Sequence, residues 1–290
     1  MIDRIRAALS KAGTISDFRI TETLRTGAEW YFIGDKLETA RSKETADYEV
    51  VVYADSPDKK NRGACTFRVL PSMTDAELAS SVARALGTAR NIKNAWYPIP
   101  DKASAAGADA LPQSQFAGKD PAAAMAGLRD ALYRFNATGG ASINSLELFL
   151  TKIDERIVNS QGVDAAFSYW RGFSEFIVNA ASDGKEVELY GDISFSEPDY
   201  ERLAREMQNK LIEASDRLRA VPTPDCAGLP VILRGSSAEE FYAYWFNACQ
   251  NAALYQHVNP FAPGEDTGEP GKDGDVVDLQ LGRASCRERV

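Results

Sequence analysis

The sequence contains a single histidine, His257, and four cysteines, none of which forms a Cys-x-x-Cys pair. One histidine cannot supply the two or three imidazoles of the common zinc hydrolase sites, and isolated cysteines form neither a zinc ribbon nor a disulfide scaffold. A Ser-His-Asp triad would have to use His257, which is more simply interpreted as a polar residue at a helix end. Sites that need several histidines from this chain are therefore excluded.

Long apolar runs and an excess of basic charge are also missing. No run approaches the roughly 20 apolar residues that a membrane-spanning helix needs. The N-terminal residues carry charges at helical spacing, where a signal peptide would be apolar. The 290 residues include 33 Lys and Arg against 42 Asp and Glu, a formal net charge of −9. Because coating nucleic acid requires cationic side chains, we expect a cytoplasmic protein with no membrane or nucleic-acid partner.

What the sequence does contain predicts an α+β fold. Gly13 ends a first expected helix, and Thr74 and Glu77 have capping-box spacing at the start of a second. Asp120-Pro121 begins a third, after a linker at 101–119. The expected helices cover 2–12, a stretch from 74, 120–136 and 198–219. The expected strands cover 18–24, 30–33, 48–53, 65–70, 145–151, 155–159, 167–178 and 186–195.

This order of elements predicts an N-terminal α+β domain over residues 1–224, with mixed or antiparallel sheets and packed helices. Two similar halves, 1–100 and 120–220, would explain the repetition, although many α+β domains show such an order by chance. Prolines near 222 predict a boundary, followed by a short buried strand at 230–233 and an aromatic helix over about 241–256. The roughly 55 remaining residues are too few for an independent core.

We therefore expect residues 225–281 to be the incomplete start of a β-rich C-terminal domain. Residues 282–290 fit nothing before them and resemble the conceptual translation of a common sequencing adapter. A genuine basic tail is the alternative. A stop codon directly after residue 290 in long-read genomic sequence would favour that alternative.

Several residues have a chemistry that could be functional, but each also has a structural explanation. Cys249 has no neighbouring histidine and is expected to be a buried apolar residue, not a nucleophile. The acidic stretch 265–278 lacks the spacing of a calcium loop and is expected to be a solvated loop. In the aromatic helix, Tyr244 and Trp245 could contact a partner subunit or a peptide, while other aromatic residues form core. The strand carboxylates are expected to be solubility groups at sheet edges: Asp154, Glu155, Asp164 and Glu175.

Three stretches resemble the TldD/PmbA family. The first is the turn Asn159-Ser160-Gln161-Gly162, where glycine suits a tight reversal and the Asn and Ser side chains can bond the turn backbone. The second is residues 29–97, with Glu29-Trp30-Tyr31-Phe32 and the alanine-rich helix from Thr74. The third is Pro230–Leu233 with the helix beginning at Ser236. No single motif is specific; their order and spacing over residues 16–280 carry the resemblance.

The resemblance implies a cytoplasmic peptidase system that pairs a metal-bearing subunit with a metal-free homologue and cleaves unfolded or flexible peptides. In the metal-bearing subunit, a His-Glu…His motif opens the C-terminal domain and binds zinc. At the matching position this chain has Asn247 and Ala248. Asparagine is a poor zinc ligand, and alanine can neither bind a metal nor accept a proton.

The chain is therefore similar to the metal-free, PmbA/TldE-like class. We expect no cofactor and no catalytic residue in this chain, zinc only in a homologous TldD-like partner, and peptide or unfolded protein as substrate. The alternative is a non-catalytic peptide-binding or scaffold protein that works without a peptidase partner. A weaker alternative is a peptidase whose residues lie beyond this sequence.

Overall fold

The structure is a computed structural model that describes residues 1–105, 113–225, 228, 230–233, 235–248, 250–260 and 262. The predictions for Cys249, for the acidic stretch 265–278 and for residues 282–290 lie outside these ranges. The chain divides into two compact units, Met1–Val221 and Pro222–Val290. Each unit is considered separately below.

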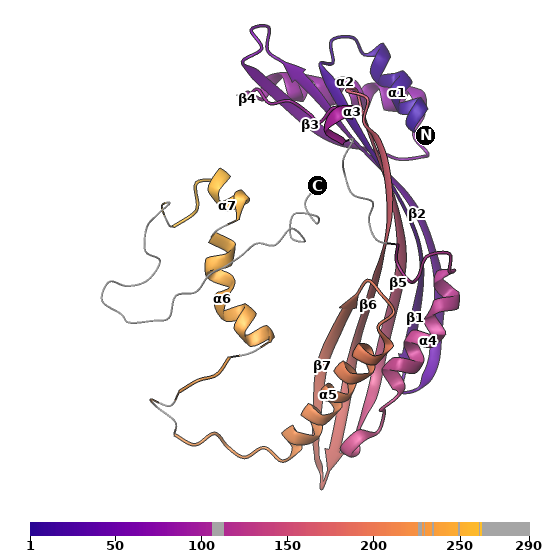
Figure 1. The fold of residues 1–290 in the computed structure, drawn as a ribbon, viewed down its shortest axis with the longest axis vertical. Helices are drawn as coiled ribbons and strands as arrows, with labels where there is room; N and C mark the ends of the chain where they lie inside the picture. Colours follow the sequence, from indigo (N-terminus) through magenta and orange to yellow (C-terminus); the bar gives the residue numbers. More distant parts are fainter. Residues whose placement is uncertain are drawn as a thin grey trace. The chain divides into compact units, whose positions relative to one another are not determined.

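The first unit is built on one antiparallel sheet of seven strands in the order β4-β3-β2-β1-β5-β6-β7 (Figure 1). The α+β class expected from the sequence is confirmed. The strands are β1 (Asp17–Ile33), β2 (Lys36–Asp55), β3 (Asn61–Val69), β4 (Asn94–Ala95), β5 (Ala141–Asn159), β6 (Asp164–Ser182) and β7 (Lys185–Phe195).

The helices of this unit begin where the sequence predicts caps. Thr74 and Glu77 form a complete capping box, and Asp120 accepts hydrogen bonds from the next helix's first backbone amides. Gly13 follows the first helix with φ +65°, which glycine adopts without steric cost. The helices are α1 (Ile2–Lys11), α2 (Asp75–Asn91), α3 (Lys102–Ala105), α4 (Pro121–Tyr133), the 3-10 turn η1 (Thr138–Gly140) and α5 (Tyr200–Leu218).

The strands are fewer and longer than predicted. The expected pairs of strands 18–24 with 30–33, and 145–151 with 155–159, are single strands, β1 and β5. The polar stretches between them stay extended because both neighbours pair with them; Arg25, for example, lies opposite Thr45 on β2 and Ile153 on β5. Ladder pairing here outweighs the polarity that suggested loops.

Both helix pairs pack on the same face of the sheet. Helices α1 and α2 cover one end, and α4 and α5 cover the other (Figure 1). Each helix pair forms a buried hydrophobic cluster with the sheet. On β1, Ile20 belongs to the cluster under α1 and α2, and Ala28 and Phe32 belong to the cluster under α4 and α5. These residues are separated by even numbers of positions, and side chains alternate along a strand, so all three point toward the helices. The short helix α3 belongs to a segment that lies on the opposite face, where Tyr97 packs edge to face on Tyr53 of β2.

The second unit differs from its prediction in two places. Residues 230–233 are not a strand; Val231 and Ile232 are 78% and 91% exposed. No described strand of this unit lies beside them, and a single short strand without a neighbour is not stable. The single helix expected over 241–256 is instead α6 (Ser236–Ala248) and α7 (Asn251–Tyr255), separated at Gln250, whose backbone is extended.

None of the helices in the described ranges combines the length and the apolar character that crossing a membrane requires.

Candidate functional site

The turn motif singled out in the sequence joins β5 to β6. Asn159 Oδ1 accepts hydrogen bonds from the backbone amides of Gln161 and Val163, both at 3.0 Å. Gly162 has φ +84°, the left-handed conformation that the sequence led us to expect of a glycine. The Asn159 side chain thus holds the reversal from within, as an Asx turn does.

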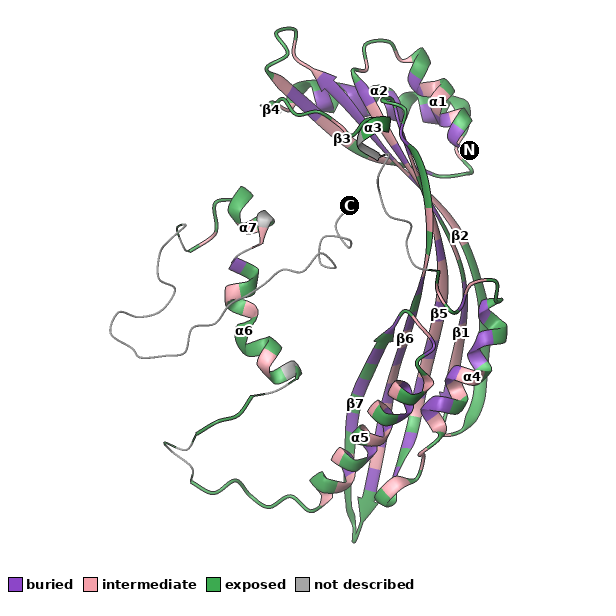
Figure 2. Ribbon diagram, in the orientation of Figure 1, coloured by how far each residue is buried: buried purple, intermediate pink, exposed green. Residues whose placement is uncertain are grey.

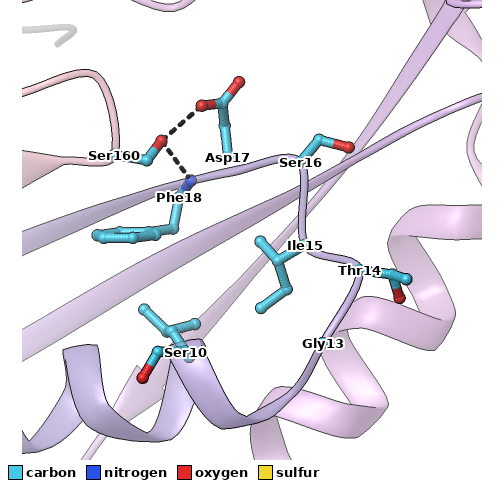
Figure 3. A pocket seen from close by; sticks show the side chains of 9 residues that line it. Ser10, Gly13, Thr14, Ile15, Ser16, Asp17, Phe18 and Ser160 are labelled. Carbon is cyan, nitrogen blue, oxygen red and sulfur yellow. Dashed lines mark hydrogen bonds between the residues drawn. The ribbon is translucent and has the colours of Figure 1, made fainter.

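Ser160 reaches out of this turn. Its hydroxyl donates to Asp17 Oδ1 at 2.5 Å and accepts from the backbone amide of Phe18 at 3.1 Å (Figure 3). The expectation that Ser160 bonds the turn backbone is therefore wrong, because β1 offers it a buried carboxylate and a free amide. Gln161 Nε2 donates to the same Asp17 oxygen at 2.6 Å.

Asp17 is bound on its other side by a buried arginine. Arg62 Nη2 donates to Asp17 Oδ2 at 2.9 Å, and Arg62 Nε donates to Asp55 Oδ1 at 2.7 Å. The guanidinium lies over the rings of Tyr53 and Trp96, 5.7 Å and 5.0 Å from their centroids. The hydrogen bond from Arg62 holds the pKa of Asp55 below its ordinary value.

Asp17, Asp55, Arg62 and the turn at 159–162 form one polar cluster. The segment after α2 is hydrogen-bonded to this cluster. Trp96 Nε1 donates to Asp55 Oδ2 at 3.3 Å, and Asn159 Nδ2 donates to the carbonyl of Pro100 at 2.7 Å. Lys102 N donates to the carbonyl of Gln161 at 3.3 Å. The cluster therefore connects β1, β2, β3, the β5–β6 turn and the segment that runs past them.

A pocket of about 310 Å³ opens beside Ser160 (Figure 3). The end of α1, the loop 13–16 and the first residues of β1 line it. The polar side chains around it are already bonded: Ser160 to Asp17, and Ser16 Oγ to the amide of Asp55 at 2.8 Å. A ligand here would have to compete with these hydrogen bonds.

The geometry at Ser160 does not make a nucleophile. A serine hydroxyl needs a general base that can take its proton, and the partner of Ser160 is a carboxylate paired with a buried guanidinium. That carboxylate is already engaged by the guanidinium of Arg62 and by the amide of Gln161. The arrangement holds the end of the sheet together and is best understood as structural.

The helix that resembles the zinc-motif position is α6. Asn247 is exposed, and its Oδ1 accepts a hydrogen bond from Gln250 Nε2 at 2.9 Å; Ala248 is 7% exposed. Within the described ranges, no group of three or more His, Cys, Asp or Glu side chains could hold a metal ion. That zinc belongs only to a partner subunit stays a prediction.

The aromatic residues of α6 pack on one another. Trp245 contacts Phe241 at 5.8 Å and Tyr244 at 5.6 Å between ring centroids, and Tyr244 is 59% exposed. That Tyr244 and Trp245 contact a partner subunit or a peptide stays a prediction.

The four strand carboxylates have different surroundings. Asp164 forms a two-pronged pair with Arg156 at 2.8 Å, and Asp154 pairs with Lys152 at 2.8 Å. Glu155 lies opposite Phe167 across β5 and β6, and Glu175 lies opposite Glu147. Asp154, Glu155 and Glu175 therefore have paired strands on both sides, so the expectation that they lie at a sheet edge is wrong.

Sequence reasoning missed Asp17, Asp55 and Arg62. The expected strand here began only at residue 65, but Asn61 begins β3 and Arg62 is 3% exposed. The only local signal was a lone arginine before a glycine at a strand start. Its partner Asp17 is 45 residues away, which no local pattern reveals.

Comparison with known proteins identifies the fold. The chain is similar to TldE from Thermococcus kodakarensis, with a TM-score of 0.53 and 11% identity over 74% of this chain and 47% of that one. Two proteins named as candidate modulators of DNA gyrase also match. The one from Thermotoga maritima has a TM-score of 0.51 and 14% identity over 73% and 47% of the two chains. The one from Bacteroides thetaiotaomicron has a TM-score of 0.57 and 12% identity over 88% and 58%.

No protein-family model and no curated protein matches the sequence. This chain spans about half the length of the solved structures that it matches. At this level of identity the likeness is one of fold. The fold that the TldD/PmbA resemblance implied is therefore confirmed.

Proposed function

We propose that this chain is a metal-free subunit that pairs with a homologous, metal-bearing TldD-like subunit and helps it to cleave unfolded or flexible peptides. The fold shared with TldE supports the proposal. The observation that carries it is the chemistry of α6, where Asn247 and Ala248 stand at the position that the resemblance assigns to a zinc ligand and a general base. We further propose a cytoplasmic location, which the free thiol of Cys65 supports.

An amide and a methyl group cannot replace the missing pair. A zinc ligand must offer a good lone pair at a fixed position, and the general base must take a proton from the attacking water. The side-chain oxygen of Asn247 already accepts a hydrogen bond from Gln250 at the end of the helix. Hydrolysis in the proposed system therefore takes place on the partner subunit.

The sheet offers a means to hold extended peptides. Strand β7 pairs with β6 only from Gly172 to Ser182, so no described strand pairs with the outer side of β6 over residues 164–171. Strand β3 likewise pairs with β2 only from Tyr48 onward, so no described strand pairs with the outer side of β2 over residues 36–47. An extended peptide that adds to such an edge is held by main-chain hydrogen bonds, which tolerate many sequences. Such tolerance suits a system that acts on flexible peptides.

Reconstitution tests the proposal. The full chain, the homologous metal-bearing subunit, and a mixture of the two are each assayed with a flexible fluorogenic peptide, with zinc and then with a chelator. We expect efficient, chelator-sensitive cleavage only from the mixture, together with a complex on size exclusion. Zinc-dependent cleavage by this chain alone would overturn the proposal.

The second candidate is a peptide-binding or scaffold protein that works without a peptidase. The unpaired strand edges favour it, since they could bind peptides whether or not a metal-bearing subunit is present. Failure to form any complex with the homologous subunit, combined with retained peptide binding, would select this candidate.

A further inference from the structure

The face of the sheet opposite the helices carries a cluster of aromatic rings. Residues with intermediate exposure alternate with buried ones along β5 and β6 (Figure 2). Tyr31 meets Phe149 edge to face at 5.7 Å, and Phe149 stacks on Phe173 at 6.1 Å. The three rings come from β1, β5 and β6. A sheet with large apolar residues on both faces is usually covered on both.

A row of carboxylates lies directly beside these rings. The strand register places Glu147 of β5 opposite Glu175 of β6, and Glu175 opposite Asp192 of β7. Neighbouring strands are about 4.8 Å apart, so the row covers about 10 Å across the sheet. We call Tyr31, Phe149, Phe173, Glu147, Glu175 and Asp192 the aromatic–acidic surface.

These carboxylates lack a paired cation among the described residues. Among the described residues, no ion pair includes Glu147, Glu175 or Asp192. Arg41, whose field reaches Glu147, is held by Glu29 at 3.1 Å and lies over the Tyr31 ring. Like charges placed directly opposite each other destabilise a sheet. The row therefore costs stability in the free chain, and a bound cation would remove that cost.

We propose that the aromatic–acidic surface binds lysine- and arginine-containing segments of flexible peptides. The aliphatic stems of these side chains would lie on the Phe149–Phe173 pair, and their charged ends would lie on the carboxylate row. The inference rests on the proposed function for the nature of the partner, a flexible peptide. The requirement for positive charge comes from the surface alone.

Other occupants fit the charge less well. A second copy of this chain would bring the same carboxylate row to the interface, and the whole chain carries a net charge of −9. Nucleic acid would bring phosphates against carboxylates. A cationic peptide supplies both the apolar stems and the charge that the surface lacks.

Fluorescence anisotropy with the full chain tests the inference. Three labelled peptides of equal length share a glycine–serine backbone and carry either lysine and arginine, glutamine, or glutamate. We expect the cationic peptide to bind at least about tenfold more tightly than the glutamine peptide, and the glutamate peptide to bind least. Equal binding of the cationic and glutamine peptides would overturn the inference.

A charge-matched control separates this surface from general attraction to an acidic protein. The double variant Glu147→Gln/Glu175→Gln removes two charges from the row, and Glu186→Gln/Glu188→Gln removes two exposed charges from β7. We expect the first to lose most of the cationic preference and the second to keep it. Equal losses in both would show long-range attraction only and contradict the inference.

Two further checks keep the result interpretable. Glu147→Gln/Glu175→Gln removes the repulsion between two facing carboxylates, so we expect its free energy of unfolding to be no lower than that of the wild type. Phe173→Leu should weaken binding of the cationic peptide by removing its aromatic platform. All these measurements use the chain without its partner subunit. Failure of the cleavage assay in the proposed function therefore leaves them unaffected, and their failure does not affect that assay.

Discussion

The carboxylate of Asp17 and the guanidinium of Arg62, 45 residues apart in the sequence, lie 2.9 Å apart where both side chains are almost completely buried. The pair joins the first residues of β1 to the first residues of β3. Ser160 and Gln161 add the β5–β6 turn through the second oxygen of Asp17. Removing one member of such a pair leaves the other charge buried without compensation.

Replacing Arg62 by methionine should therefore destabilise the protein by about 3–5 kcal/mol, because Asp17 and Asp55 both lose the buried cation that pairs with them. Urea unfolding followed by circular dichroism measures the change. Arg68→Met is the matched control, since Arg68 is an exposed arginine on the same strand. We expect the control to change the free energy of unfolding by less than about 0.5 kcal/mol. Equal effects of the two substitutions would contradict the importance of the buried pair.

The hydroxyl of Ser160 donates to Asp17 and accepts from Phe18 N. Ser160→Ala removes both bonds while keeping the backbone of the turn, and should cost about 1–3 kcal/mol in unfolding free energy. Ser142→Ala, at an exposed serine on β5, serves as the comparison and should be nearly neutral. A neutral Ser160→Ala would show that water replaces the hydroxyl without loss.

Gly63 marks a close approach between β3 and α2. A Cβ at this position would lie 1.8 Å from the carbonyl oxygen of Ala89, a backbone atom that cannot move independently of the helix. Gly63→Ala should therefore destabilise the unit, by about 1–3 kcal/mol or more. Gly87→Ala, in the same helix with no atom within 4 Å of the new Cβ, should stabilise it by about 0.5–1 kcal/mol. Thermal unfolding of both variants should show opposite shifts.

Glu147 makes stability depend on pH. Burial, together with the neighbouring carboxylate of Glu175, raises the pKa of Glu147 above its ordinary value of 4.5, and Glu29 adds to the shift while Arg41 opposes it. The folded chain thus holds the proton more tightly than the unfolded chain does. The stabilising contribution of this group is present in full below the ordinary pKa, and it is lost as the pH rises through the raised pKa.

Glu147→Gln should therefore raise the free energy of unfolding near neutral pH, and its advantage over the wild type should shrink as the pH falls toward the ordinary glutamate pKa. Urea unfolding of both proteins across this range measures the difference. Glu188→Gln, at an exposed glutamate on β7, provides the comparison. A pH-independent difference for Glu147→Gln would contradict the origin of the effect in ionisation.

Local chemistry made several elements predictable. The capping box at Thr74 and the Asp120-Pro121 pair begin helices where expected, because a cap depends on residues within one turn. The polar half of β2, from Lys36 to Asp47, was not predicted as strand. Its extended shape depends on pairing with β1, whose register is a property of the whole sheet.

The same distinction between local and long-range interactions holds for the candidate site. Asn159 and Gly162 could be identified as a turn because their roles are local. The Asp17–Arg62 pair and the Glu147–Glu175–Asp192 row could not, because each joins residues that only the strand order brings together. The strand at 230–233 was wrongly predicted from its apolar residues, since apolar character alone supplies no neighbouring strand.

Metal analysis of the purified chain, before and after complex formation with the homologous metal-bearing subunit, tests the central claim most directly. The account predicts no stoichiometric zinc in this chain alone, and about one zinc per heterodimer in the peptide-cleaving complex, held by the partner. Stoichiometric zinc bound to the isolated chain, with loss of that zinc on substitution of Asn247, would contradict it.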